Sequence, residues 1–237
     1  MNAVVILNLR DFLPMCARAS FQHAAARWGA TYLEITEALG PMHHFWQKAI
    51  IPSSPHVARF ERVLQLDCDM LVRSDCPSPF DVVPATNFGV VSRVQTGNPL
   101  HLLRYLGKKA AKKFALDAYP DEFYHINAGF ILYNTAAHAK ELRLWFDAGK
   151  HCRWANWLFP EQLALSCILH QTNVPTTWLP SEWNCLHPWR VYHAGARAFE
   201  QPGQSMQANV YHFNRPRGRQ PLKSMMENVQ WDMTCQK

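Results

Sequence analysis

Short apolar runs that alternate with helical patterns constrain the fold of this 237-residue chain more than any other feature. Runs with the length of buried strands lie at 4–9, 31–36, 63–66 and 88–92. Helical patterns at 12–28 and 45–50 separate the first three of these runs. This alternation is typical of parallel strands joined by crossover helices. The sequence therefore predicts an α/β fold, with a mostly parallel twisted sheet and helices on both faces.

The second half of the chain continues the pattern less regularly. We expect helices at 99–120, 136–148 and 161–169, a strand at 130–133, and short strands in "RVYH" and "NVYHF". Neither an internal repeat nor a low-complexity linker interrupts the chain. With 48% hydrophobic and only 18% charged residues, a chain of this length can bury one sizeable core. We predict a single domain spanning residues 1–237.

The charge balance indicates an anionic partner. The net charge is +6 and the pI is about 9, which favours a nucleotide, a phospholipid surface or a nucleic acid. No nucleic-acid recognition motif accompanies the charge, so we expect no nucleic-acid partner. The run "KKAAKKF" is either a solvated helix face or a peripheral contact with an anionic membrane.

Cysteine usage and hydropathy favour a cytoplasmic protein, with the membrane contact as an open alternative. The seven cysteines are odd in number and include no CxxC pair, which fits reduced thiols better than a disulfide framework. The first residues lack a basic region followed by a long apolar core, so we expect no secretory signal. No window reaches about 18 consecutive apolar residues, the length of a membrane-spanning helix.

Two aspartates follow the apolar run at 63–66 in "RVLQLDCDMLV". Ligands of a parallel sheet bind outside the carboxyl ends of its strands. In an extended backbone, Asp67 and Asp69 would point the same way and could hold Mg²⁺ or Mn²⁺ together with substrate phosphates. The alternative is a turn cap beside a surface ion pair. A haloacid-dehalogenase-type phosphatase is disfavoured, because Leu71 stands where its D-x-D-x-[TV] pattern needs Thr or Val.

Three more stretches stand in a fixed order with this pair: "YHINAGFILYN", "PEQLALSCIL" and "LPSEWNCL". Together the four resemble glycosyltransferase family eight, the glycogenin and lipopolysaccharide galactosyltransferase type. That family shows a strand before D-x-D, an N-[SA]-G before a strand, a D-Q pair opening a helix, and a W-N. The resemblance implies a GT-A nucleotide-diphospho-sugar transferase fold.

The resemblance also implies roles for individual residues. Metal ligands would be Asp67, Asp69 and His212, with His193 as the alternative to His212. The residues around the transferred sugar would be Gln162, Glu161 and Asn127. Contacts to the nucleotide sugar would come from Asn8, Arg10, Lys48, Asp67, Gly129, Asn184 and Arg215. Asn127 could instead be a strand-end turn residue alone.

Three departures from the family pattern affect what is implied. The usual H-x-x-G-x-x-K-P-W is shifted in "NVYHFNRPRGRQPL". Glu161 replaces the usual Asp, and the extra methylene changes its reach. The first strand lacks the usual Asp-x-x-Tyr, so the nucleotide base is less well specified.

The implied activity is metal-dependent transfer of a hexose from a nucleotide sugar, UDP-hexose above all, with retention. The acceptor would be a saccharide or a lipid-linked or protein-linked glycan. The chemistry fits the residues independently, because departure of a nucleoside diphosphate leaves negative charge that a divalent cation stabilises. An inactive sugar- or nucleotide-binding relative and an inverting enzyme of the same fold are the alternatives.

Overall fold

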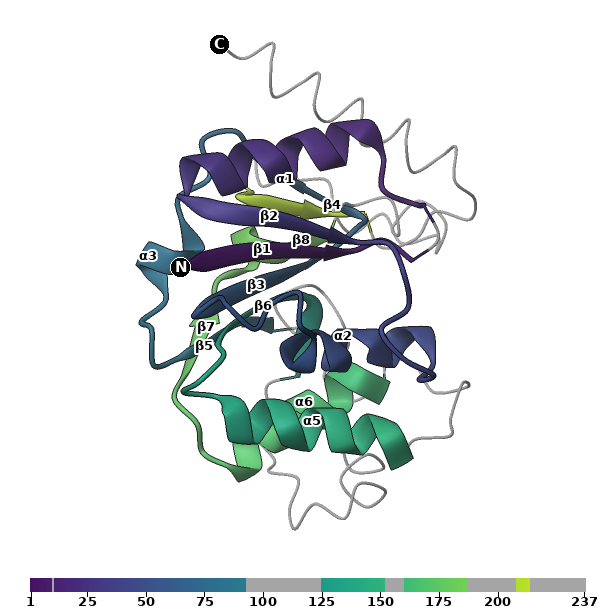
Figure 1. Ribbon diagram of the computed structural model, residues 1–237. Helices are drawn as coiled ribbons and strands as arrows, with labels where there is room; N and C mark the ends of the chain where they lie inside the picture. The colour runs from purple at the N-terminus through teal and green to yellow at the C-terminus, as the bar shows by residue number, and fades with distance from the viewer. Residues whose placement is uncertain (10, 93–124, 152–159, 187–207, 214–237) are drawn as a thin grey trace, which may run out of the picture.

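The computed structural model describes residues 1–9, 11–92, 125–151, 160–186 and 208–213. A six-stranded sheet in the order β2-β1-β3-β6-β5-β7 forms its centre (Figure 1). Its strands are β1 (Asn2–Leu7), β2 (Ala30–Ile35), β3 (Arg62–Asp67), β5 (Phe88–Ser92), β6 (Ile126–Asn134) and β7 (Thr176–Leu179). The pairs β1–β2, β1–β3 and β5–β7 are parallel, whereas β6 is antiparallel to both β3 and β5. The predicted mostly parallel sheet is confirmed, with β6 as the reversed strand.

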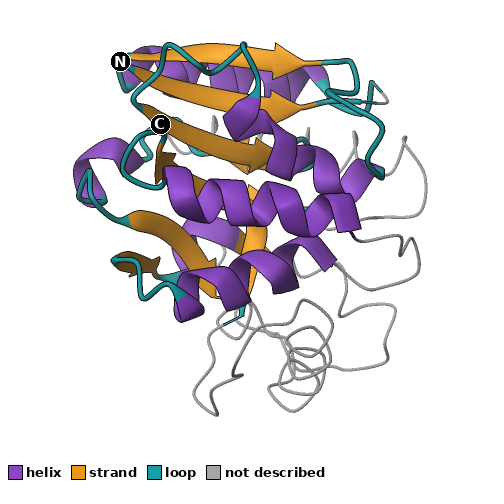
Figure 2. Ribbon diagram, turned by 60° about the horizontal axis from the view of Figure 1, so that its bottom comes forward, coloured by secondary structure: helices purple, strands orange, loops and turns teal. Residues whose placement is uncertain are grey.

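Helices lie on both faces of this sheet. They are α1 (Met15–Arg27), α2 (Gln47–Ile50), α3 (Pro79–Val82), α5 (Ala139–His151) and α6 (Pro160–Gln171). Short 3-10 helices cover η1 (His44–Trp46), η2 (Ile51–Ser53) and η3 (Ser181–Asn184). Figure 1 shows α1 above β2, with α2, α5 and α6 on the opposite side, and Figure 2 shows helices covering the strands on that side.

Alternate residues of β1 belong to two separate cores. Val4 and Ile6 pack in one hydrophobic cluster with Phe21 of α1. Ala3 and Val5 pack in the other, which includes helices α5 and α6. A strand buried on both faces has no polar side to show. For this reason the run at the start of the chain is continuously apolar instead of alternating.

Two helices begin later than the sequence predicted, because polar side chains accept hydrogen bonds from the turns that precede them. The helix predicted to begin at residue 12 begins at Met15, since Asn8 Oδ1 accepts the N–H groups of Phe12 (2.8 Å) and Leu13 (3.2 Å). The helix predicted over 136–148 begins at Ala139, after a turn capped by an asparagine at the end of β6. The expected helix at 99–120 and the strand in "RVYH" lie outside the described residues.

A second, three-stranded sheet has the order β4-β9-β8. Its strands are β4 (Met70–Val72), β8 (Cys185–Leu186) and β9 (Val210–His212). β4 pairs antiparallel with β9 so that Met70 faces His212. This small sheet brings the C-terminal part of the described chain against the end of β3.

Candidate metal and donor site

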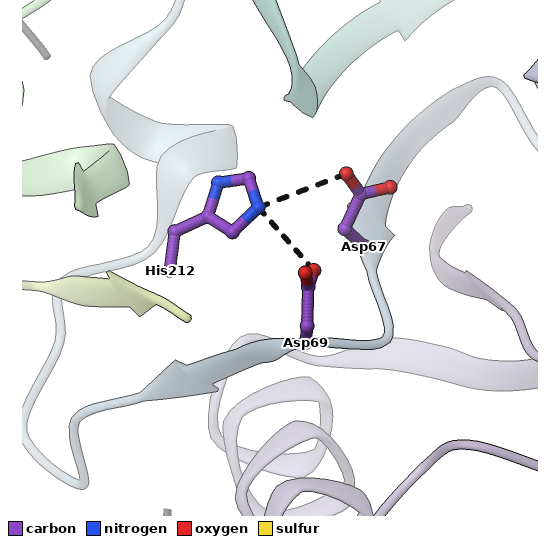
Figure 3. A group of neighbouring side chains, drawn as sticks. All are labelled: Asp67, Asp69 and His212. Atoms are coloured by element: carbon purple, nitrogen blue, oxygen red, sulfur yellow. Dashed lines mark ion pairs between the residues drawn. The ribbon is translucent and has the colours of Figure 1, made fainter. Parts of the chain in front are cut away.

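Three side chains converge where β3 ends. His212 Nε2 lies 3.3 Å from Asp69 Oδ1 and 3.9 Å from Asp67 Oδ2 (Figure 3). One ligand atom from each residue lies within 4.8 Å of the others. The two aspartates and the histidine therefore form one cluster, although 143 positions separate His212 from Asp69 in the sequence (212 − 69).

Strand pairing builds this cluster. Asp67 is the last residue of β3, and a turn at Cys68 and Asp69 leads into β4. The backbone N–H of Phe213 donates to Asp69 O at 2.8 Å, next to the pair between Met70 and His212. The backbone between the aspartates is thus a turn and not the extended segment we expected, because the chain must leave the large sheet to begin the small one.

The donor set fits a divalent cation. With metal–ligand bonds of about 2.1 Å, ligand atoms on one octahedral ion lie roughly 3 Å apart when adjacent and up to about 4.2 Å apart when opposite. The distances of 3.3 Å from His212 Nε2 to Asp69 and 3.9 Å to Asp67 both lie in that range. Two carboxylates with one imidazole suit Mn²⁺ better than Mg²⁺, which prefers oxygen ligands.

The neighbouring charges keep Asp69 ionised. Burial by itself would raise the pKa of Asp69, but the His212 imidazole and the Lys48 ammonium outweigh burial and lower it below its ordinary value. A carboxylate that stays ionised keeps its oxygens as acceptors for a cation.

Lys48 of α2 lies on the other side of Asp67. Its ammonium forms an ion pair with Asp67 Oδ1, while Oδ2 of the same carboxylate faces His212. Burial disfavours the charged amine, but the carboxylates of Asp67 and Glu161 outweigh that cost and raise the pKa of Lys48. The lysine thus holds one oxygen of Asp67 and leaves the other directed at the cluster.

A bulge in β6 brings the N-A-G stretch to this site. Val90 of β5 pairs with Ile131, but the next residue, Val91, pairs with Asn127, so residues 128–130 have no partner in β5. Bulges of this kind redirect a strand and are frequent beside active sites. The N–H and C=O groups of Ala128 consequently need partners outside that pairing.

Two predicted site residues provide those partners. The Ala128 N–H donates to Gln162 Oε1 at 3.0 Å, and Lys48 Nζ donates to Ala128 O at 3.2 Å. A buried backbone group without a partner is costly. Gln162 and Lys48 therefore stabilise the bulge, and Lys48 also contacts the cluster through Asp67.

The other two motif residues of the bulge are also held locally. Asn127 Oδ1 accepts the N–H of Gly129 at 2.9 Å, the contact expected of a turn residue. Gly129 lies against His212, because a Cβ at position 129 would be 2.7 Å from His212 Cε1.

Glu161 opens α6 next to Gln162 and is 1% exposed. Burial raises its pKa to about 7, against the opposing effect of Lys48. Its Oε2 has no hydrogen-bond partner among the described residues. The structure thus gives Glu161 a buried oxygen without a hydrogen-bond partner, and its predicted place near the transferred sugar stays a prediction.

Asn184, at the end of η3, lies behind the histidine. His212 Nδ1 is 2.8 Å from Asn184 Oδ1. The asparagine is fully buried, and its predicted contact with the nucleotide sugar stays a prediction.

Asn8 belongs to a network at the ends of β1 and β2. Its Nδ2 donates to Glu34 Oε1 at 2.8 Å, and Arg18 donates to both oxygens of Glu34 at 2.8 Å each. Tyr32 OH donates to Glu34 Oε2 at 2.9 Å. The sequence analysis missed Arg18 and Glu34. No local signal could have paired them, because one lies on a helix and the other on a strand.

The remaining predicted residues, Arg10, His193 and Arg215, lie outside the described residues, as does the "KKAAKKF" run. Among the described residues, His212 is the histidine of the cluster, and His193 stays an alternative that the structure does not test. Across the described ranges, the helices are too short or too polar to cross a bilayer.

Comparisons with known proteins bear on the fold. No protein-family model matches the sequence, and no curated protein matches it by sequence. A solved glycosyltransferase involved in the glycosylation of the major capsid of PBCV-1 superposes with a TM-score of 0.62 at 10% identity, covering 95% of this chain and 98% of that one. The galactosyltransferase LgtC, in complex with donor and acceptor sugar analogs, gives 0.53 at 14% identity, covering 96% of each chain.

A third structure, the glycosyltransferase GlyE of Streptococcus pneumoniae TIGR4, gives a TM-score of 0.56 at 13% identity. The match covers 98% of this chain and 63% of GlyE, so this chain is similar to only part of that protein. At these identities the likeness concerns the fold alone. The architecture predicted from the sequence motifs is confirmed: the chain has the GT-A fold found in these glycosyltransferases.

Proposed function

We propose that this protein is a divalent-metal-dependent glycosyltransferase that moves a hexose from a UDP-sugar to a saccharide or glycoconjugate acceptor with retention. The observation that carries the proposal is the cluster of Asp67, Asp69 and His212 at the carboxyl end of β3. Ligands of open α/β sheets bind at that edge. The donor class and retention rest on the family resemblance of the motifs.

Asp67, Asp69 and His212 would hold Mn²⁺ or Mg²⁺. When bound, the ion would supply positive charge to the departing nucleoside diphosphate. Lys48 adds a fixed ammonium beside the same place and orients Asp67 through its Oδ1. The site then contains two carboxylates, one ammonium and one divalent cation, an arrangement suited to an anionic diphosphate.

Gln162 acts through its amide nitrogen. Its oxygen accepts the Ala128 N–H, and the hydrogens on Nε2 are the donors it can offer a sugar. Glycosyl transfer passes through an oxocarbenium-like transition state, and a neutral amide is a poor general base. We assign Gln162 to sugar orientation and Glu161, with its free oxygen, to a hydrogen bond with a sugar hydroxyl.

The test is a panel of UDP-sugars incubated with the purified protein and Mn²⁺, Mg²⁺ or a chelator. We expect UDP release with one UDP-hexose, dependent on the metal, and an increase when an acceptor saccharide is added. Proton NMR of the product anomeric signal decides between retention and inversion. A folded protein that binds UDP in a thermal-shift assay but turns over no sugar would be the inactive relative instead.

A further inference from the structure

We infer that Asn184 is a positioning residue: its carboxamide oxygen accepts the Nδ1–H of His212 and so keeps Nε2 directed at the aspartates with its lone pair free for a metal. The inference rests on the proposed function, because it deepens the description of the same metal site. The carrying observation is that the two ring nitrogens of His212 face different partners. Nδ1 is 2.8 Å from Asn184 Oδ1, and Nε2 is 3.3 Å from Asp69 Oδ1.

The backbone fixes the position of Asn184. It ends η3 and immediately precedes β8, and β8 pairs parallel with β9 so that Cys185 faces Tyr211 and Leu186 faces His212. The same segment is also held by the N–H of Asn209, which donates to Glu182 O at 2.7 Å. Asn184 and His212 are therefore brought together by strand pairing and not by a flexible side-chain contact.

The chemistry of the amide decides which nitrogen carries the proton. A carboxamide oxygen can only accept, so it requires a hydrogen on Nδ1 and leaves Nε2 as the nitrogen with a lone pair. If the NH₂ group of Asn184 faced Nδ1 instead, Nδ1 would have to accept. The proton of a neutral His212 would then be on Nε2, the nitrogen that faces the aspartates. Histidine ligands of metals commonly donate the other ring N–H to such a partner, which fixes both tautomer and ring orientation.

Gly129 restrains the ring in addition. A Cβ at position 129 would be 2.9 Å from His212 Nδ1 and 2.7 Å from Cε1. The imidazole thus lies against the backbone of the β6 bulge while Asn184 holds its Nδ1. His212 is 4% exposed, so water has little access to replace the amide oxygen as acceptor.

Two substitutions of Asn184 distinguish the effect of its acceptor oxygen from the effect of its side-chain shape. Asn184→Leu keeps a similar shape and removes the acceptor, and Asn184→Asp keeps an acceptor. We expect Asn184→Leu to weaken Mn²⁺ binding about 10- to 100-fold, the usual effect of losing such a partner. Asn184→Asp should bind Mn²⁺ at least as tightly as the wild type. Isothermal titration calorimetry of the whole chain with Mn²⁺ alone measures both.

Asn134→Leu is the matched control. Asn134 is a buried asparagine whose oxygen caps a backbone turn at the end of β6, and it contacts no residue of the cluster in the described structure. This variant should lose thermal stability and keep wild-type Mn²⁺ affinity. A loss of affinity in Asn184→Leu without that loss in Asn134→Leu separates positioning from general destabilisation.

A second readout does not need the metal. In ¹⁵N NMR of the metal-free protein, at a pH at which the imidazole is neutral, His212 Nδ1 should carry the proton and Nε2 should not. An unprotonated Nδ1 would overturn the inference, as would equal Mn²⁺ affinities of the wild type and Asn184→Leu. If Asn184→Leu does not fold, a folded Asn184→Asp that has lost affinity would also overturn it. A wild type with protonated Nδ1 that binds no Mn²⁺ would support the inference and remove the metal from the proposed function.

Discussion

Gly129 and His212 approach so closely that a methyl group at position 129 would be 2.7 Å from the imidazole Cε1. Real Cβ contacts are essentially never that short. The glycine of the N-A-G stretch is therefore required by the position of the histidine, whatever contact it makes with a sugar. The bulge in β6 and the end of β9 depend on each other at this point.

Gly129→Ala should displace the His212 ring and weaken Mn²⁺ binding by roughly tenfold or more, the range found for disturbed metal-ligand supports. Calorimetric titration with Mn²⁺ measures the change. Gly40→Ala is the control, because a Cβ there would meet Ile50 Cδ1 at 3.4 Å, an ordinary contact. Unchanged Mn²⁺ affinity in a folded Gly129→Ala protein would contradict the placement of His212 at the metal.

Asp69→Asn should abolish Mn²⁺ binding and UDP-sugar turnover while the protein stays folded, because an amide is a much weaker ligand for a hard cation than a carboxylate. Turnover assays and circular dichroism measure the two properties. Asp75→Asn makes the same chemical change at an exposed side chain and should retain full activity. Metal-dependent turnover that persists in Asp69→Asn would argue against the cluster as the metal site.

Gln162→Ala should cost about 1–3 kcal/mol of unfolding free energy, because it leaves the buried Ala128 N–H without its acceptor. Gln162→Glu keeps an oxygen in that place and should lose much less stability when measured at acidic pH, where a buried carboxyl is neutral, while it removes the Nε2 hydrogens proposed to orient the sugar. Urea unfolding monitored by fluorescence gives the free energies. Gln171→Ala, at an exposed position of the same helix, should be close to neutral, and similar losses in all three variants would contradict the assigned contact.

Glu161 should make the metal-free protein less stable as pH rises from about 4.5 to about 7. Its pKa is raised from the ordinary 4.5 to about 7 by burial, so the folded protein holds a proton that the unfolded chain has lost in that interval. Glu161→Gln should remove this effect, with a relative gain above pH 7 on the order of 3 kcal/mol at most.

The measurement for Glu161 is the unfolding free energy of both proteins at several pH values in chelator. The difference between Glu161→Gln and the wild type should be small near pH 4 and largest near pH 8. A difference that does not vary with pH would show that the carboxyl is not neutral in the folded state.

Glu34 should make the protein less stable as pH falls, which is the opposite of the effect expected of Glu161. Hydrogen bonds from Arg18 lower its pKa to about 2, against the effect of burial and with help from Asn8 and Tyr32. The stabilisation is therefore present above about pH 4.5 and is lost as pH falls toward about 2. Glu34→Gln should be destabilised relative to the wild type at pH 6, and the gap should narrow toward pH 2.

Unfolding free energies of Glu34→Gln between pH 2 and 6 measure that gap. Glu37→Gln, at an exposed position close by in the sequence, should follow the wild type throughout. A constant gap would mean that the network acts through shape and not through the charge of Glu34.

The sequence by itself predicted the class of sheet, most strands of the central sheet and the residues of the candidate metal cluster. The strand at 88–92 was predicted with the bounds that β5 has, because a fully buried strand is a continuous apolar run between turn residues. Asp67 and Asp69 were named from their place after an apolar run, whereas His212 was named from the family resemblance, with His193 as its alternative. These features are encoded locally, in periodicity and in the chemistry that a cation requires.

The tertiary structure decided how those parts meet. The pairing of β4 with β9 places His212 beside Asp69, and the β6 bulge turns Gln162 and Lys48 into partners of the Ala128 backbone. The contact between Asn184 and His212 arises from the pairing of β8 with β9. None of these contacts follows from a local sequence pattern, because each depends on which distant strands pair and in which register. The pairing and the register are set by the burial of the whole core.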